Sequence, residues 1–179
     1  MPGVRLPQGG YRPPEGNLLQ LGDHLVSIVD TKQQGVKASG NYSIEIKVGN
    51  EEGTLTDYCV ITDNTLFHVM QYIAATAPKP SDPKDITEAQ WEGWLKGFNY
   101  LDAPADVNRL CESLKTRSRP FWVTVISRKD NKGNDRLEID VMPNRKPIRL
   151  ATDTEVQMFK PYQSGVDGSA PEEEEGPSL

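Results

Sequence analysis

The spacing of apolar residues changes twice along this chain, and this change limits the folds that it can adopt. Residues 41–48 (NYSIEIKV) alternate strictly, so that one side of the segment carries Tyr42, Ile44, Ile46 and Val48. A period of two indicates a strand with one buried face. Between residues 65 and 114 the apolar residues recur three and four positions apart, which indicates amphipathic helices. Alternation then returns, so the sequence predicts strands on both sides of a helical middle.

Turn-forming residues divide the alternating segments into individual strands. We expect five strands, at residues 22–31, 41–48, 54–61, 120–128 and 136–142. Glycine in the NEEG sequence at 50–53 turns the chain into the third strand. Lys132-Gly133-Asn134 lies between the last two segments and is typical of a hairpin turn.

The predicted helical region contains residues that commonly begin helices. Asp63 or Asn64 can cap a helix over residues 65–75, and Thr87 to Gln90 offers a capping box for a second helix. Pro104 fits the first turn of a third helix over residues 105–114. Trp91 and Trp94 repeat at helical spacing on the second helix, which favours a core position for both over a ligand platform.

The order of these elements predicts a mainly β fold with a helical insert, of the α+β class. Five strands with helices between strands 3 and 4 match a five-stranded OB-fold-like barrel, although other small barrels share the order. We expect residues 1–20, rich in Pro and Gly, to form an extended N-terminal arm. Residues 21–149 form the domain, with its insert at about 63–116, and residues 150–179 form a flexible acidic C-terminal tail.

Charge is distributed unevenly along the chain. Residues 109–149 contain 11 Lys and Arg against 5 Asp and Glu, a net charge of 11 − 5 = +6. Residues 150–179 contain 1 Lys against 7 acidic residues, or 1 − 7 = −6, and residues 1–108 give 8 − 14 = −6. A basic part of a domain indicates a polyanion ligand. The acidic tail can compete for that surface or recruit a basic partner, and the alternative is a tail that only improves solubility.

The basic residues of this region surround an aromatic strand. Phe121 and Trp122 fall on opposite faces, so one can fill the barrel while the other points outward and stacks on bases. A buried Trp122 with a solvated rim of cations is the alternative. The candidate nucleic-acid-binding residues are Lys32, Lys37, Arg117, Arg119, Trp122, Arg128, Lys129, Lys132 and Arg136. We expect the cations of the last two strands to gather on a single open side of the barrel.

The sequence lacks the motifs that are typical of several classes of protein. His24 and His68 lie far apart, neither is at metal-ligand spacing, and no phosphate-binding loop or nucleophile elbow occurs. Cys59 and Cys111 are too few for a disulfide framework and are typical of reduced, partly buried thiols. No apolar run approaches the roughly 20 residues that cross a bilayer. The sequence therefore predicts a cytoplasmic protein that is not an enzyme and needs no cofactor or metal.

Three long segments together resemble a known family. The runs GDHLVSIVDTKQQGVKASGNYSIEIKV, EGTLTDYCVIT and FWVTVISRKDNKGNDRLEIDVMPNR resemble phage-encoded single-stranded-DNA-binding proteins of the OB-fold type. The resemblance spans roughly residues 6–146 in layout. Its specific parts are the LPQGGY opening, the K-x-S-G-N turn before the second strand and the K-G-N hairpin before Pro143.

This resemblance implies a function and partners. It implies single-stranded-DNA binding without catalysis in phage replication or recombination, in the host cytoplasm. It also implies that an acidic tail, here with Glu172, Glu173, Glu174 and Glu175, contacts replication or recombination proteins. The chain departs from the family at its tip, where Leu179 replaces an aromatic residue, and the insert can serve homo-oligomer formation. The alternative is an acidic adaptor or inhibitor that mimics a polyanion.

Overall fold

The computed structural model describes residues 17–36, 40–62, 65–142, 144–145 and 147–163. Its strands are β1 (Gly22–Val36), β2 (Tyr42–Asn50), β3 (Gly53–Val60), β4 (Phe121–Lys129), β5 (Asp135–Ile139) and β6 (Arg149–Leu150). Its α-helices are α1 (Leu66–Thr76), α2 (Glu88–Gly97), α3 (Pro104–Lys115) and α4 (Asp153–Met158). Short 3-10 helices, η2 (Pro83–Asp85) and η3 (Asn99–Leu101), connect the helices of the insert.

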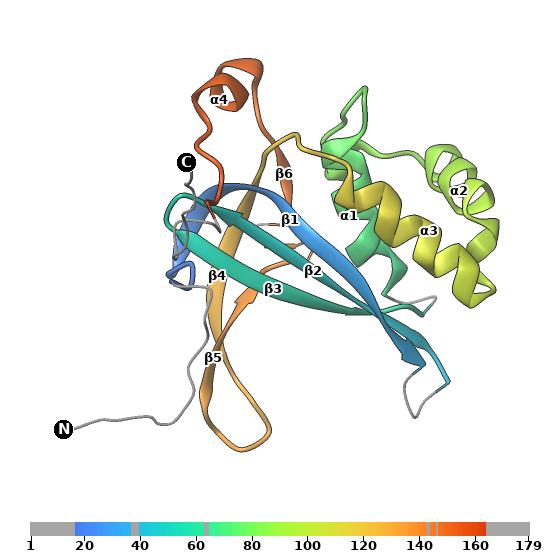
Figure 1. The fold of residues 1–179 in the computed structure, drawn as a ribbon, viewed down its shortest axis with the longest axis horizontal. Helices are drawn as coiled ribbons and strands as arrows, with labels where there is room; N and C mark the ends of the chain where they lie inside the picture. Colours follow the sequence, from blue (N-terminus) through green and yellow to red (C-terminus); the bar gives the residue numbers. More distant parts are fainter. Residues whose placement is uncertain (1–16, 37–39, 63–64, 143, 146, 164–179) are drawn as a thin grey trace, which may run out of the picture.

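The strands form one curled antiparallel sheet. Five of them follow the order β3-β2-β1-β4-β5, and the short β6 pairs with β4. The long β1 joins the two halves, because its first part pairs with β4 and its second part with β2. Figure 1 shows that the sheet bends into a half-barrel, with α1, α2 and α3 together on one side. The structure is thus a mixed fold of an antiparallel half-barrel and several helices.

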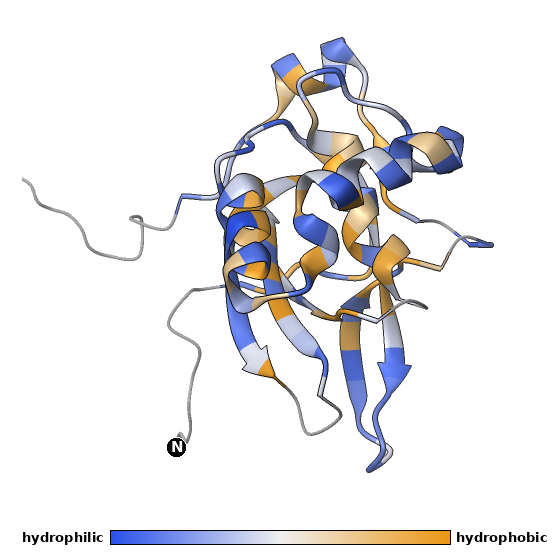
Figure 2. Ribbon diagram, turned by 90° about the vertical axis from the view of Figure 1, so that its right-hand side faces the viewer, coloured by the Kyte–Doolittle hydropathy of each residue, from blue (hydrophilic) through white to orange (hydrophobic). Residues whose placement is uncertain are grey.

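The core lies on the concave side of the sheet and under the insert. Strand β2 contributes Ile44, Ile46 and Val48, all fully buried, as its alternation predicts. Helix α3 buries Val107, Leu110, Cys111 and Leu114, a stripe at helical spacing that packs on β1. Thr31 on β1 donates its hydroxyl to the Cys111 carbonyl oxygen at 2.5 Å and so ties the helix to the strand. Figure 2 shows apolar residues on both the strands and the helices, and a hydrophilic tip on the β4–β5 hairpin.

The capping box and the hairpin turn that the sequence predicts are both present in the structure. Thr87 accepts a hydrogen bond from the Gln90 amide at 3.2 Å, and Gln90 accepts one from the Thr87 amide at 3.0 Å, which confirms the capping box. Gly133 has φ +82° in the β4–β5 turn, a conformation that glycine adopts without strain. Trp91 and Trp94 are half-buried and pack against the core from α2. The predicted caps Asp63 and Asn64 lie outside the described residues.

At both ends, residues that the sequence assigns to the arm and to the tail pack into the domain. Leu19 is fully buried, and Leu18 forms a parallel bridge with Thr54, so residues 17–19 pack beside β3 instead of belonging to an arm. At the other end β6 and α4 fall within the range assigned to the tail. The physical reason is local: Ala151 is buried, and Thr152 caps α4 through the Glu155 amide at 3.2 Å. Residues 1–16 and 164–179 lie outside the described residues.

Candidate nucleic-acid interface

The outer face of β1, β2 and β3 carries alternating charges. Because Ile44, Ile46 and Val48 point inward, Glu45 and Lys47 point outward. The register places Lys32 opposite Glu45, and Lys47 opposite both Asp30 and Thr56. Together these side chains surround a shallow hollow of about 230 Å³, lined by Asp30, Thr31, Lys32, Glu45, Lys47 and Thr56. The strands therefore present a polar surface with two lysines and two carboxylates.

Tyr58 is the most exposed aromatic residue of this face. It lies on β3 opposite Glu45, and 55% of its surface is exposed. A second hollow, of about 280 Å³, runs between β3 and β5 and includes Tyr58, Thr56 and Arg136. Thr56 lines both hollows, so the surface continues from the lysines of β1 and β2, past Tyr58, to the arginine of β5.

The β4–β5 hairpin adds more cations beside this surface. Arg128 contacts Glu138 at 2.9 Å, and Lys129 contacts Asp135 at 2.7 Å. All four side chains are more than a third exposed, so water screens both pairs and each contributes little to stability. Lys132 lies exposed in the turn. Residues 128–138 contain four basic and three acidic residues, a net charge of 4 − 3 = +1.

Some charges of the surface are already paired and others are not. Asp30 contacts Lys115 at 3.3 Å, which compensates one negative charge on this face, and Glu45 accepts a hydrogen bond from the neutral Gln34 side chain. Within the described part of the chain, Lys32 and Lys132 form no ion pair. The ammonium of Lys47 lies 5.9 Å from the ring centroid of Tyr162, in the segment that follows α4.

Two of the predicted DNA-binding arginines anchor the fold instead. Arg117 donates to the Ile73 carbonyl oxygen at 3.3 Å and to the Ser113 hydroxyl at 3.2 Å, and burial lowers its pKa. Arg119 donates to the Ala151 carbonyl oxygen at 2.9 Å and contacts Asp153 at 3.4 Å. They hold the connection between α3 and β4 against α1 and the C-terminal segment.

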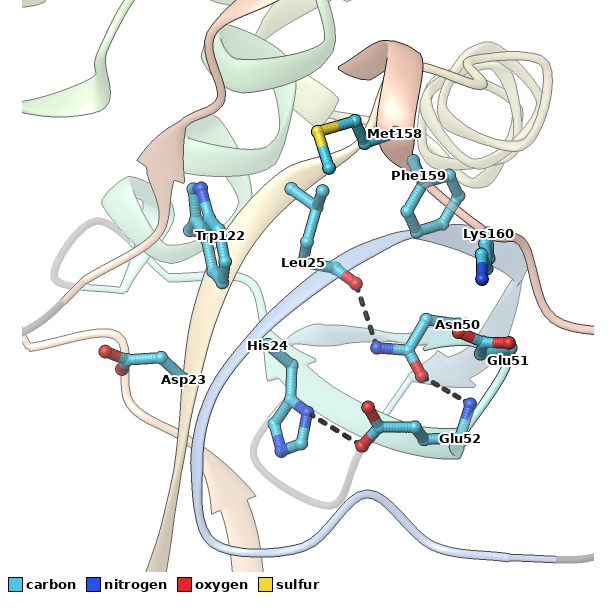
Figure 3. A pocket seen from close by; sticks show the side chains of 10 residues that line it. All are labelled: Asp23, His24, Leu25, Asn50, Glu51, Glu52, Trp122, Met158, Phe159 and Lys160. Atoms are coloured by element: carbon cyan, nitrogen blue, oxygen red, sulfur yellow. Dashed lines mark hydrogen bonds and ion pairs between the residues drawn. The ribbon is translucent and has the colours of Figure 1, made fainter. Parts of the chain in front are cut away.

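Trp122 lies in a hollow of a different character. Phe121 is fully buried and Trp122 half-buried, so the two rings do point to opposite faces. Figure 3 shows Trp122 on one side of this hollow, and Met158 and Phe159 on the other. Asp23, Glu51 and Glu52 also line it, and Lys160 is its one lysine among the described residues. Hydrogen bonds from the Thr152 amide and the Trp122 side chain lower the pKa of Glu155 on α4.

The structure separates the predicted site residues into groups. Arg119 lies just before β4 and Trp122 near its start, whereas Arg128 and Lys129 lie at its end, about 20 Å from Trp122 for six residues of strand. Lys132 and Arg136 follow in the hairpin and β5, and Lys32 belongs to the lysines of β1 and β2. The expected single cluster is therefore divided. Lys37 and the four tail glutamates, Glu172 to Glu175, lie outside the described residues.

Sequence reasoning misses a polar cluster on the inner side of β3. Asp57 accepts hydrogen bonds from His68 at 2.6 Å and from the Tyr72 hydroxyl at 2.5 Å, with Cys59 beside them. Burial, together with the Asp57 charge, raises the pKa of Cys59 and of Tyr72 well above the usual values. The available signal is the spacing of Asp57 and Cys59, two positions apart and thus on one face of a strand.

Comparisons with known proteins supply no identity for this chain. No protein-family model matches it, and no curated protein matches it significantly. Among the described residues, no helix is both long enough and apolar enough to span a bilayer.

Proposed function

We propose that this protein binds single-stranded DNA without catalysis, on the surface formed by the outer face of β1–β3 and the β4–β5 hairpin. The observation that carries the proposal is the position of Tyr58. Its exposed ring lies between the hollow that contains Lys32 and Lys47 and the strand that carries Arg136. An exposed aromatic ring flanked by cations is the arrangement that holds single strands without reading their sequence.

The topology supports the proposal. A curled sheet in the order β3-β2-β1-β4-β5, with α1 to α3 between β3 and β4 in the chain, is compatible with an OB-fold. Proteins of that fold bind oligonucleotides on the face of strands 2 and 3, between the β1–β2 and β4–β5 loops. Tyr58 and Lys47 occupy that face, and Lys132 occupies the second loop. The resemblance to phage single-stranded-DNA-binding proteins points to the same function.

Each part of the surface has a defined role in this proposal. The Tyr58 ring stacks on a base, and the cations neutralise phosphates on either side. Arg128 and Lys129 are engaged in exposed ion pairs that contribute little, so they can exchange a carboxylate for a phosphate at small cost. Trp122 has no stacking role here, because the nearby carboxylates of Asp23, Glu51 and Glu52 repel a polyanion.

Titration with a fluorescent oligothymidine tests the proposal. Tyr58→Ala should weaken binding by about 1–3 kcal/mol, which is roughly 5- to 150-fold in Kd. Tyr100→Ala is the matched control, since Tyr100 is 50% exposed on η3, in the helical insert, and should bind like the original chain. No binding by the original chain at low salt, or equal affinity of the two variants, would contradict the proposal. Metal-dependent cleavage of the labelled strand would contradict the non-catalytic role.

The hollow at Trp122 favours a second candidate function, the binding of a basic protein segment. Glu51, Glu52 and two aromatic rings suit a lysine or arginine side chain, through charge and cation–π contact, whereas Asp23 already pairs with Arg149 at 3.4 Å. Replacing both Glu51 and Glu52 with Gln should weaken the binding of an arginine-rich peptide and leave oligothymidine binding unchanged. Equal peptide affinity before and after the replacement would remove this candidate.

A further inference from the structure

A cluster of three different metal-ligand types lies where β3 meets α1. Asp57 and Cys59 point inward from β3, and His68 approaches them from the first turn of α1. One carboxylate oxygen, one sulfur and one ring nitrogen of this cluster all lie within 4.8 Å of one another. Asp57 and Cys59 are buried, and the side chain of His68 is only 13% exposed.

We propose that Asp57, Cys59 and His68 bind a zinc ion, which links β3 to the helical insert. Zinc accepts sulfur, nitrogen and oxygen ligands at about 2.0–2.3 Å in a tetrahedron. At these bond lengths the ligand atoms lie about 3.4 Å apart. The His68 nitrogen and the Asp57 oxygen are 2.6 Å apart, so they have to separate by less than about 1 Å, which small side-chain rotations achieve.

The surroundings provide what a zinc site needs beyond its ligands. Asp57 and His68 line the hollow of about 280 Å³ between β3 and β5, so water can reach the ion and fill the fourth position. Tyr72 donates to Asp57 at 2.5 Å and fixes the carboxylate. Tyr72 is itself held rigidly, because it is fully buried and packs edge-on against Phe121, with ring centroids 5.7 Å apart.

A purely structural hydrogen-bond network is the competing explanation of the cluster. In that case His68 and Tyr72 satisfy the buried Asp57 carboxylate, and no ion is required. This explanation accounts for Asp57, His68 and Tyr72. It does not account for the position of the Cys59 sulfur, within 4.8 Å of the other two donors. The zinc proposal is independent of DNA binding, and either one can fail alone.

Cobalt titration of the full chain, after treatment with a chelator, distinguishes the two explanations. We expect one Co²⁺ per chain, visible absorption typical of tetrahedral cobalt, and a near-ultraviolet thiolate-to-cobalt band that Zn²⁺ abolishes. Cys59→Ser should lose the thiolate band. Cys111→Ser is the matched control, because Cys111 is also a buried free thiol, and it should keep the band.

Melting experiments provide a second measurement that does not depend on the cysteine variants. Zn²⁺ should raise the Tm of the original chain, since an ion that binds only the folded state stabilises it. His68→Gln, which alters a partly exposed helix position, should weaken Co²⁺ binding at least tenfold and reduce that shift. The absence of both a thiolate band and a zinc-dependent Tm shift in the original chain would overturn the proposal. Equal bands in Cys59→Ser and Cys111→Ser would also overturn it.

Discussion

Asp57 is a carboxylate on the inner face of a strand whose other inward side chains are apolar or a thiol. Its cost of burial is offset by the two hydrogen bonds that it accepts, from His68 and Tyr72. Both donors belong to α1, so the carboxylate fixes the position of this helix on the sheet. The contact between sheet and insert therefore depends on polar groups as well as on apolar packing.

Removing one donor should reveal how much this network contributes. Tyr72→Phe keeps the ring and its contact with Phe121 but leaves Asp57 without one hydrogen bond. We expect the free energy of unfolding to fall by about 1.5–3 kcal/mol, the range for a hydrogen bond to a charged group. Urea denaturation measures the change. Tyr58→Phe, at an exposed phenol, is the control and should stay within about 0.5 kcal/mol of the original chain.

Single residues also show where sequence reasoning succeeds and where it stops. Alternation correctly places Phe121 and Trp122 on opposite faces of the strand but leaves open which of the two is buried. It cannot show that acidic residues and the segment around α4 surround Trp122, because these come from distant parts of the chain. It likewise places Asp57 and Cys59 on one face but cannot bring His68 to them. Sequence reasoning misses the exposed Tyr58, since aromatic residues on strands are more often buried.

At the scale of elements, strong hydrophobic periodicity is sufficient to predict a strand or a helix from the sequence. Elements too short to show a period are not predicted. The five predicted strands and three predicted helices all occur, with boundaries that differ by a few residues. β1 continues to Val36, further than predicted, because its pairing with β2 runs on to Tyr42. β6 and α4 have two and six residues, too few for any period to be visible. Their position depends on contacts such as that of Arg119 with Ala151.

The packing of residues 17–19 beside β3 leads to a prediction about Gly53. A Cβ atom added at this position would lie 2.4 Å from the Asn17 carbonyl oxygen. Gly53→Ala should therefore push the N-terminal segment away from β3 and lower the free energy of unfolding by roughly 1–3 kcal/mol. Denaturation in urea measures this loss.

Replacing Gly93 on α2 with alanine should have the opposite effect on stability. An added Cβ there meets no atom within 4 Å. Gly93→Ala should leave stability unchanged or raise it by about 0.5–1 kcal/mol, because alanine favours the helix. If both alanine variants were as stable as the original chain, the close approach of Asn17 to Gly53 would not hold in solution.

At the scale of the whole molecule, lysines and arginines divide unequally between two polar surfaces. Three carboxylates and one lysine line the hollow at Trp122. The two hollows around Tyr58 contain Lys32, Lys47 and Arg136, together with the carboxylates of Asp30, Glu45, Asp57 and Glu138. The overall charge of −6 conceals this division. A strand of DNA should therefore bind around Tyr58 and not at Trp122, and binding should depend strongly on salt.

This division predicts how the salt dependence responds to mutation. The double variant Lys132→Gln/Arg136→Gln should weaken oligothymidine binding. It should also reduce the slope of log K against log salt concentration by about 1.4, because each phosphate of a single strand that a cation neutralises adds about 0.7 to this slope. Lys79→Gln/Lys84→Gln is the matched control, since both lysines are exposed between α1 and α2. An equal change of slope in both double variants would mean that only net charge matters.

The double role of β1 has a consequence for how the molecule is made. β2 and β3 follow β1 directly, so these three strands can assemble while the chain is still short. The first part of β1 has to wait for β4, since Gly22 pairs with Val125, 125 − 22 = 103 residues later. During synthesis this stretch offers an unsatisfied backbone edge to any neighbouring chain. β1, which joins the two halves of the sheet in the finished molecule, is thus the strand whose edge stays unpaired longest during synthesis.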